Sequence, residues 1–216
     1  LQAALREIYR ELVEINTTDS VGDNTKAAEA MAARLRAAGF PAADVQVLAP
    51  APRKGNLVAR SRGNGVRKPL LLLAHLDVVE ARREDWTVDP FTLLEKDGFF
   101  YARGTLDDKA MAAIFVANAF RFKQEGFQPD RDIIIALTAD EEGGGSNGVS
   151  WLLQNKKELV DGAGVINEGG GGTLREGKYL FNTVQAAEKT VTNYTLRVTN
   201  RGGHSSVPRP DNAITT

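Results

Sequence analysis

The sequence predicts an α/β fold with a mostly parallel central sheet that is flanked by helices. The apolar runs 70–74 and 133–137 are too short for helices and are typical of strands that are buried on both faces. The amphipathic segment 109–126 between them has the length of the helical crossover that parallel strands require. Near residue 188 the pattern changes to alternating apolar and polar residues, which predicts the start of a smaller α+β domain.

The N-terminal part is expected to form two helices and two short strands. Apolar residues recur with helical spacing in the first helix, at Leu5, Ile8, Leu12 and Ile15. The alanine-rich segment 25–38 is the second helix, because Gly39 and Pro41 stop it. The strands are expected at 45–48 and 56–61, and a polar turn at 61–68.

Strands and helices alternate through the rest of the first domain. The expected strands are 70–75, 99–102, 132–138 and 164–167, and the expected helices are 109–126 and 147–155. The expected strand 99–102 is followed by the acidic residues Asp107 and Asp108, which precede the expected helix 109–126. An apolar face on that helix is assigned to the core, through Met111, Ile114, Phe115 and Phe122. The alternation of Tyr194, Leu196 and Val198 predicts a half-exposed antiparallel strand, so we expect domains at 1–188 and 189–216.

Composition excludes several classes of function. The net charge of −1 offers no electrostatic footprint for nucleic acid, and no apolar run approaches the roughly 18 residues of a membrane span. The chain opens on an amphipathic helix, so no signal peptide is expected. The absence of cysteine excludes disulfides and thiolate sites, and it is compatible with the cytosol, the periplasm or secretion. Imidazole chemistry is limited to His75 and His204.

The strand 70–75 ends on a histidine that has a carboxylate two residues beyond it. In an extended chain His75 and Asp77 point to the same side. A carboxylate there can fix the ring of a metal-binding histidine. The alternative is a histidine that is only hydrogen-bonded to its neighbour.

Carboxylates follow three further predicted strands, as Asp107 and Asp108, as Asp140, Glu141 and Glu142, and as Glu168. Ligands of open α/β sheets lie at the carboxyl ends of the strands, where these side chains would repel one another unless a cation lay between them. A pair of borderline divalent metals about 3.5–4 Å apart would satisfy such a set. The structural alternatives are a helix cap, a solvated loop and a lone surface acid, although the glycines 143–145 argue against a merely solvated loop.

In their order and spacing, these residues resemble the zinc aminoacylase/carboxypeptidase family, metallopeptidase family twenty. The motifs are His75-Leu76-Asp77, Gly104-Thr105-Leu106-Asp107-Asp108-Lys109, Asp140-Glu141-Glu142-Gly143-Gly144, Asn167-Glu168-Gly169 and Gly203-His204-Ser205-Ser206-Val207-Pro208. The Gly104–Lys109 motif, with Trp86 and Asp89-Pro90-Phe91 upstream, is most similar to the carboxypeptidase S-like branch. The family also includes carboxypeptidase G, carnosinase and succinyl-diaminopimelate desuccinylase.

The resemblance implies a site for two zinc ions, or for other divalent metals such as cobalt or manganese. The implied metal ligands are His75, Asp107, Glu142 and Glu168, with Asp107 as the bridge and a cis peptide bond after it. The implied catalytic residues are Glu141 as general base, Asp77 as the partner of His75, and His204 as a donor to the carbonyl oxygen of the scissile amide. A surface histidine in a turn is the alternative for His204.

The implied activity is hydrolysis of a peptide bond, of carboxypeptidase or dipeptidase type, by a water that two zinc ions activate. An N-acyl-amino-acid hydrolase is the alternative enzyme, and an inactive metal-binding scaffold is the alternative from another class. Glu141 beside Glu142 argues against the scaffold, since binding a metal requires the ligand but not the base. The expected partners are a small peptide or N-acyl amino acid and, through a lid or dimerisation domain at 189–216, a second copy of the chain.

One element of the family pattern is missing from this sequence. The pattern includes a second metal-binding histidine, and no third histidine exists here. The resemblance therefore implies that the catalytic domain at 1–188 lacks its C-terminal part. We expect partial metal occupancy and no activity in the 216-residue chain itself.

Overall fold

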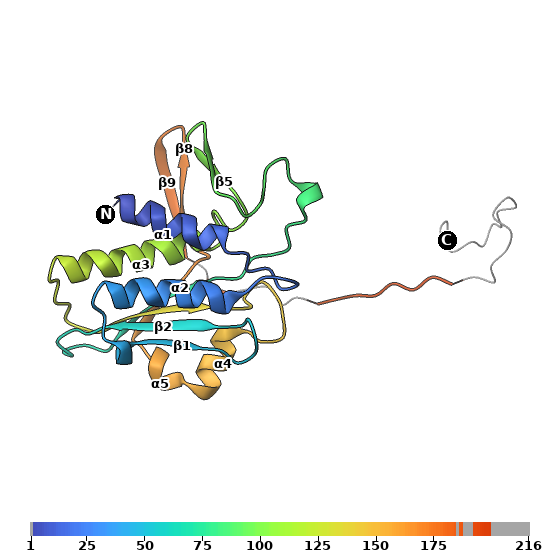
Figure 1. The fold of residues 1–216 in the computed structure, drawn as a ribbon. Helices are drawn as coiled ribbons and strands as arrows, with labels where there is room; N and C mark the ends of the chain where they lie inside the picture. Colours follow the sequence, from blue (N-terminus) through green and yellow to red (C-terminus); the bar gives the residue numbers. More distant parts are fainter. Residues whose placement is uncertain (1, 185, 188–191, 200–216) are drawn as a thin grey trace, which may run out of the picture. The chain divides into compact units, whose positions relative to one another are not determined.

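The computed structural model describes residues 2–184, 186–187 and 192–199 (Figure 1). Its helices are α1 (Gln2–Glu14), α2 (Asn24–Ala37), α3 (Lys109–Gln124), α4 (Gly148–Asn155) and α5 (Lys157–Val160). Its strands are β1 (Val45–Leu48), β2 (Asn56–Ser61), β3 (Leu70–His75), β4 (Leu94–Lys96), β5 (Phe99–Tyr101), β6 (Ile133–Thr138), β7 (Gly164–Ile166), β8 (Gly171–Arg175) and β9 (Lys178–Thr183). The chain divides into two compact units, Leu1–Gly169 and Gly170–Thr216.

A five-stranded sheet in the order β1-β2-β6-β3-β7 forms the centre of the first unit. β3 is parallel to β6, with His75 opposite Thr138, and parallel to β7 on its other side. β2 pairs antiparallel with β6, and β1 antiparallel with β2. The predicted α/β fold with parallel central strands is therefore confirmed, with antiparallel strands added at one edge.

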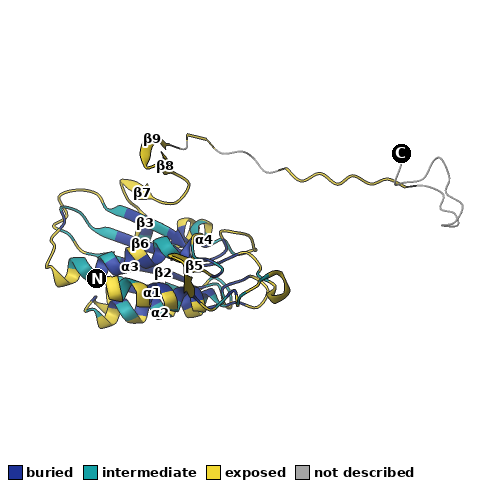
Figure 2. Ribbon diagram, turned by 90° about the horizontal axis from the view of Figure 1, so that it is seen from above, coloured by how far each residue is buried: buried dark blue, intermediate teal, exposed yellow. Residues whose placement is uncertain are grey.

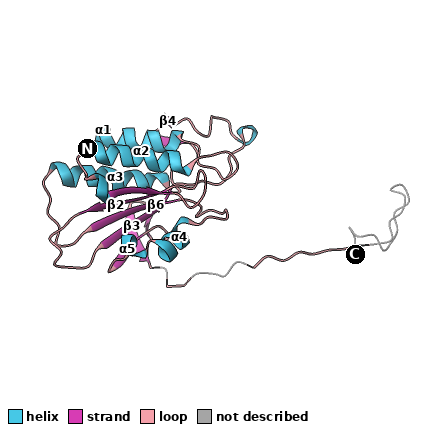
Figure 3. Cartoon of the chain, turned by 60° about the horizontal axis from the view of Figure 1, so that its bottom comes forward, coloured by secondary structure: helices cyan, strands magenta, loops and turns pink. Residues whose placement is uncertain are grey.

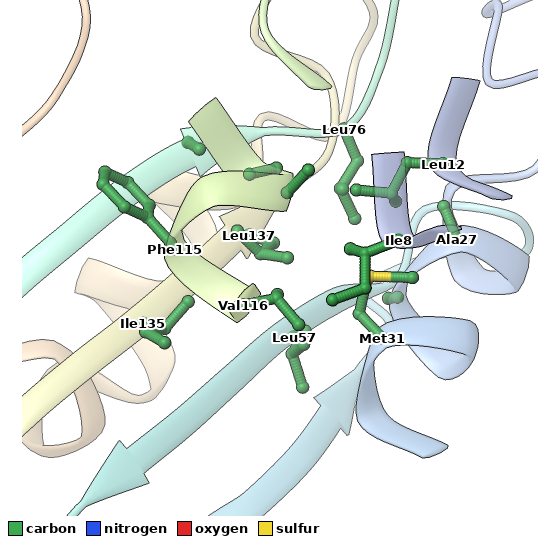
Figure 4. Packing of buried hydrophobic residues seen from close by; sticks show 14 of the residues in the cluster. Ile8, Leu12, Ala27, Met31, Leu57, Leu76, Phe115, Val116, Ile135 and Leu137 are labelled. Atoms are coloured by element: carbon green, nitrogen blue, oxygen red, sulfur yellow. The ribbon is translucent and has the colours of Figure 1, made fainter. Parts of the chain in front are cut away.

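Helices cover both faces of this sheet, with α1, α2 and α3 on one face and α4 and α5 on the other (Figure 3). Successive strand residues alternate between the two cores, because side chains along a strand point to opposite faces. Leu57 and Leu137 join the larger core, whereas Val58 and Ala136 join the smaller one. Figure 4 shows Leu57 and Leu137 among side chains of the three covering helices.

The buried face of α3 differs in part from the prediction. Phe115 is buried and Met111 packs against the larger core as expected, but Ile114 is 45% exposed, and Ala112 and Val116 are buried in that core. Small residues let α3 pack closely, so its buried face follows the alanines rather than the largest apolar side chains. Figure 2 colours the ribbon by burial, and dark blue stretches run along the central strands and the helices packed on them.

Two predicted strands behave differently from expectation. β5 forms a separate hairpin with β4 and does not join the central sheet, so Asp107 follows a loop rather than the end of a core strand. Residues 192–199 form no strand, because a strand requires a paired neighbour and the described residues provide none there. The boundary expected at residue 188 stays a prediction.

In the second unit, β8 and β9 pair antiparallel, with an irregularity between Thr173 and Leu174. The sequence pattern predicts no strands at these positions. Among the described residues, no helix has both the length and the apolarity needed to cross a membrane.

Candidate metal centre

His75 ends β3 with a side chain that is only 3% exposed. Its Nδ1 lies 3.0 Å from the backbone oxygen of Asp77 and 3.5 Å from the carboxylate Oδ1. A proton on Nδ1 is therefore donated to Asp77, and Nε2 is left to face other ligands. Nε2 lies 2.8 Å from Oδ1 of Asp107 and 3.5 Å from Oε1 of Glu168.

Asp107 and Asp108 stand at the start of α3, joined by a cis peptide bond as the resemblance implied. Asp108 is the N-cap residue of α3, but its side chain makes no capping hydrogen bond. Its Oδ2 instead accepts the backbone N–H of His75 at 3.3 Å. The helix-cap alternative therefore does not account for this pair of carboxylates.

The loop before Asp107 is held by α1 and by a buried lysine. The hydroxyl of Tyr9 donates to the backbone oxygen of Thr105 at 2.7 Å. The fully buried Lys109 donates from Nζ to the backbone oxygen of Ile15 at 2.7 Å, and burial lowers the pKa of this lysine to about 7. Gly104 has a φ of +82° and lies against the stem of Lys109, a conformation that favours glycine.

The loop after β6 carries Glu141 and Glu142, and the carboxylate of Asp77 holds both of their backbones. Oδ1 of Asp77 accepts the N–H of Glu141 at 3.1 Å, and Oδ2 accepts the N–H of Glu142 at 3.0 Å. Asp77 therefore lies between His75 and the two glutamates and contacts all three. The sequence suggested only its partnership with His75.

The carboxylates and His75 converge closely enough to hold metal ions. Ligand atoms of His75, Asp107 and Glu142 all lie within 4.8 Å of one another, and the same holds for His75, Asp108 and Glu168. An imidazole with several carboxylates is a donor set that suits zinc and related divalent ions. The structure thus brings together the four predicted metal ligands.

Asp108 belongs to this cluster although it was not among the predicted metal ligands. The available signal was its position next to Asp107, which the helix-cap reading explained equally well. Glu141 is placed beside the cluster through its backbone contact with Asp77. His204 lies outside the described residues.

The pKa values of the cluster reflect crowded negative charge. Burial alone would lower the pKa of His75, but Asp77, Glu168 and Asp108 outweigh it and raise this pKa to about 10. Burial raises the pKa of Asp108 to about 7. Burial and the nearby Asp107 also raise the pKa values of Glu142 and Glu168. The site therefore favours added positive charge, whether protons or a divalent cation.

A cleft of about 310 Å³ opens beside the cluster. Asp107 and Glu142 line it together with Val79, Arg103 and Leu106. A small ligand in this cleft could therefore contact residues of the metal centre directly.

The described geometry agrees with comparisons to known proteins. The profile of peptidase family M20/M25/M40 matches residues 71–213. The N-fatty-acyl-amino acid synthase/hydrolase PM20D1 of Bos taurus is 39% identical over 153 residues, which are 68% of this chain and 30% of that protein. The uncharacterized carboxypeptidase C24C9.08 of Schizosaccharomyces pombe is 32% identical over 165 residues, 74% of this chain and 28% of that protein.

The succinyl-diaminopimelate desuccinylase of Delftia acidovorans is 36% identical over 138 residues, 62% of this chain and 36% of that protein. The chain thus spans roughly a third of the length of these curated relatives. Among solved structures, human carnosine dipeptidase 1 has the same fold with a TM-score of 0.62 at 20% identity, over 77% of this chain and 38% of that chain.

Proposed function

The chain belongs to peptidase family M20/M25/M40, and from that premise we propose that the complete protein is a metal-dependent hydrolase of carboxypeptidase or dipeptidase type. The observation that carries this proposal is the convergence of His75, Asp107, Glu142 and Glu168 at one edge of the sheet. The carboxypeptidase and dipeptidase names among its relatives and structural neighbours support the same reaction class.

We propose that this cluster would hold two zinc ions, with Asp107 contributing its carboxylate to both. His75 and Glu168 would hold one ion, and Glu142 would hold the other. When bound, the ions lower the pKa of a water and polarise the substrate carbonyl. The donor set supports this assignment because neutral imidazole and carboxylates are common zinc ligands.

Glu141 is the proposed general base. Neighbouring side chains diverge along the chain, so Glu142 can face the ions while Glu141 faces the substrate. Glu141 accepts a proton from the attacking water and passes it to the leaving nitrogen. His204 is proposed to donate a hydrogen bond to the carbonyl oxygen as negative charge develops there.

The second candidate is hydrolysis of an N-acyl amino acid by the same residues. The names of two relatives favour it, the N-fatty-acyl-amino acid synthase/hydrolase and the desuccinylase. Both reactions cleave an amide bond, so the metal centre does not discriminate between them. Homodimerisation through the segment 189–216 stays a prediction.

The test is a hydrolysis screen of the complete protein with dipeptides, longer peptides and N-acyl amino acids. Each substrate is assayed with zinc, after chelation, and with a Glu141→Gln control. The proposal expects zinc-dependent cleavage of one substrate class and loss of that cleavage in the control. A protein that binds zinc tightly but cleaves neither class would instead be the metal-binding scaffold.

A further inference from the structure

A buried ion pair lies next to the loop that carries Glu141 and Glu142. Nζ of Lys54 lies 2.6 Å from Oδ1 of Asp140 and 2.5 Å from Oδ1 of Asp19. The side chains of Asp140 and Lys54 are 1% and 12% exposed, whereas that of Asp19 is 63% exposed. The inner contact is thus shielded from water, and the outer contact is largely solvated.

Asp140 closes this loop through both its side chain and its backbone. Its Oδ2 accepts the N–H of Ser146 at 3.1 Å, and its backbone oxygen accepts Nδ2 of Asn147 at 3.0 Å. Its φ is +58°, a left-handed conformation that aspartate tolerates better than most residues. A Cβ at Gly144 would lie 2.5 Å from Oδ2 of Asp140, so the loop wraps tightly around this carboxylate.

The segment that holds Lys54 also supports the residue before Asp140. Oδ1 of Asn56 accepts the N–H of Ala139 at 3.0 Å. Gly55 lies between Lys54 and Asn56. A Cβ at Gly55 would lie 2.7 Å from Cα of Thr25, so the segment 54–56 packs directly against α2. Lys54 therefore extends from a backbone that has little freedom to shift.

Without Lys54, the carboxylate of Asp140 would be buried without a counter-charge. Such a group is costly, and the chain relieves the cost by exposing it to water. Exposing Asp140 means opening the turn from 140 to 147. Glu141 and Glu142 follow directly and would move with it.

We propose that Lys54 is a positioning residue. Through its ion pair with Asp140, it holds Glu141 and Glu142 at their positions beside His75 and Asp107. This inference rests on the proposed function for its catalytic consequence. Among the described residues, Nζ of Lys54 pairs with Asp140 and Asp19 rather than with the ligands of the cluster, and Lys54 does not line the cleft. Asp77 fixes the loop from the β3 side, and Lys54 fixes it from the β2 side.

The kinetic test compares Lys54→Met with Lys54→Arg in the zinc-loaded complete protein. Displacement of catalytic groups by about 1 Å can cost on the order of 100-fold in rate, so we expect kcat of Lys54→Met to fall by about 10- to 100-fold with little change in KM. Lys54→Arg keeps the charge and should recover most of the loss. Lys26→Met, the same change at an exposed lysine of α2, and Asp19→Asn should both stay within about twofold of wild type.

A second measurement does not depend on metal or on turnover. Amide hydrogen exchange of metal-free protein should accelerate in the segment 139–147 of Lys54→Met and stay unchanged in β3 and β6. The double variant Lys54→Met/Asp140→Asn leaves no unpaired charge at this position, so it should fold stably, and exchange in that segment should return toward the wild-type rate.

Unchanged kcat and unchanged exchange in Lys54→Met would overturn the proposal. Equal acceleration across the whole sheet would also overturn it, because that pattern means general destabilisation. If wild-type protein cleaves no substrate, the proposed function fails, and exchange in 139–147 alone still decides whether Lys54 positions the loop.

Discussion

The backbone nitrogen of Glu142 lies 3.0 Å from Oδ2 of Asp77, across 65 residues of sequence. The other oxygen of that carboxylate accepts the N–H of Glu141 and also faces Nδ1 of His75. Asp77 therefore couples the orientation of the imidazole to the position of the loop that supplies two glutamates. Several predictions about the metal centre depend on this coupling.

Replacing Asp77 should weaken metal binding although Asp77 is not a proposed ligand. Loss of a carboxylate behind a metal-binding histidine typically costs about 10- to 100-fold in metal affinity. We expect Asp77→Ala to lose zinc affinity in that range in a competition titration with a chelator. Asp161→Ala, at an exposed acid, is the matched control and should bind zinc as wild type does. Wild-type affinity in Asp77→Ala would contradict the coupling.

Replacing Glu141 and replacing Glu142 should have different effects on zinc content. Glu141→Ala should abolish turnover of the complete protein with zinc content nearly intact, since a general base is not a ligand. Glu142→Ala should lose both turnover and about one equivalent of zinc, measured by elemental analysis after dialysis. Equal zinc loss in both variants would rule out this division of labour.

The glycine run after Glu142 offers a test of the shape of the loop. Gly144 has a φ of +119° and no space beside Asp140, whereas Gly145 has neither restriction. Gly144→Ala should lower the stability of metal-free protein by about 1–3 kcal/mol, because it combines a strained backbone with a clash. Gly145→Ala should be nearly neutral in the same urea titration. A similar cost for both variants would show that the loop does not fold around Asp140 as described.

Asp132, at the opposite end of the sheet, should contribute a pH-dependent share of stability. Its carboxylate accepts Nη1 of Arg60 at 3.0 Å and the N–H of Gly63 at 2.9 Å. Burial alone would raise the pKa of Asp132, but these contacts and Arg62 outweigh it and lower the pKa. The folded state thus binds fewer protons than the unfolded state, and the stabilisation is complete above the unfolded pKa of about 4 and is lost as pH falls through the lower folded value.

Asp132→Asn should therefore cost about 1–3 kcal/mol at pH 7, and the cost should shrink as pH falls below about 4. Urea unfolding across a pH series measures it. Asp161→Asn, at an exposed residue, should cost little at any pH. A constant cost for Asp132→Asn from pH 7 down to about 3 would contradict the ion pair.

The larger core should be sensitive to loss of volume at β6. Leu137 is fully buried beneath α3, so Leu137→Ala should destabilise the protein by about 2–5 kcal/mol in urea unfolding. Leu153 on α4 is 52% exposed, and Leu153→Ala should cost less than about 1 kcal/mol. Comparable losses in the two variants would mean that the core is not centred on β6.

The central strands could be predicted because they are buried on both faces. β3 and β6 appear in the sequence as short continuous apolar runs, and their ends place His75 and the segment after Thr138 at one edge. β5 was assigned to the same sheet wrongly, because a periodic pattern shows that a strand exists but not which strand it pairs with. On α3, Phe115 and Met111 were assigned to the core correctly and Ile114 wrongly, since close packing selected alanines over that larger residue.

The residues that position the metal ligands were harder to predict from the sequence. Lys54 and Asp140 are 86 residues apart, and neither belongs to a motif that predicts their contact. Asp108 was ambiguous because an acid before a helix is usually a cap. Ligands with a recognisable local pattern were thus predictable, whereas the long-range contacts that orient them required the fold.

The hydroxyl of Tyr9 reaches the loop before Asp107 across 96 residues, and His75 meets Thr138 only when β3 and β6 are in register. The metal centre therefore has no local precursor in the chain. Contacts between distant segments form slowly during folding, because loop closure must come first. Tight zinc binding should consequently occur late in refolding. The rate at which refolding protein gains tight zinc binding would therefore report the rate at which β3 and β6 pair.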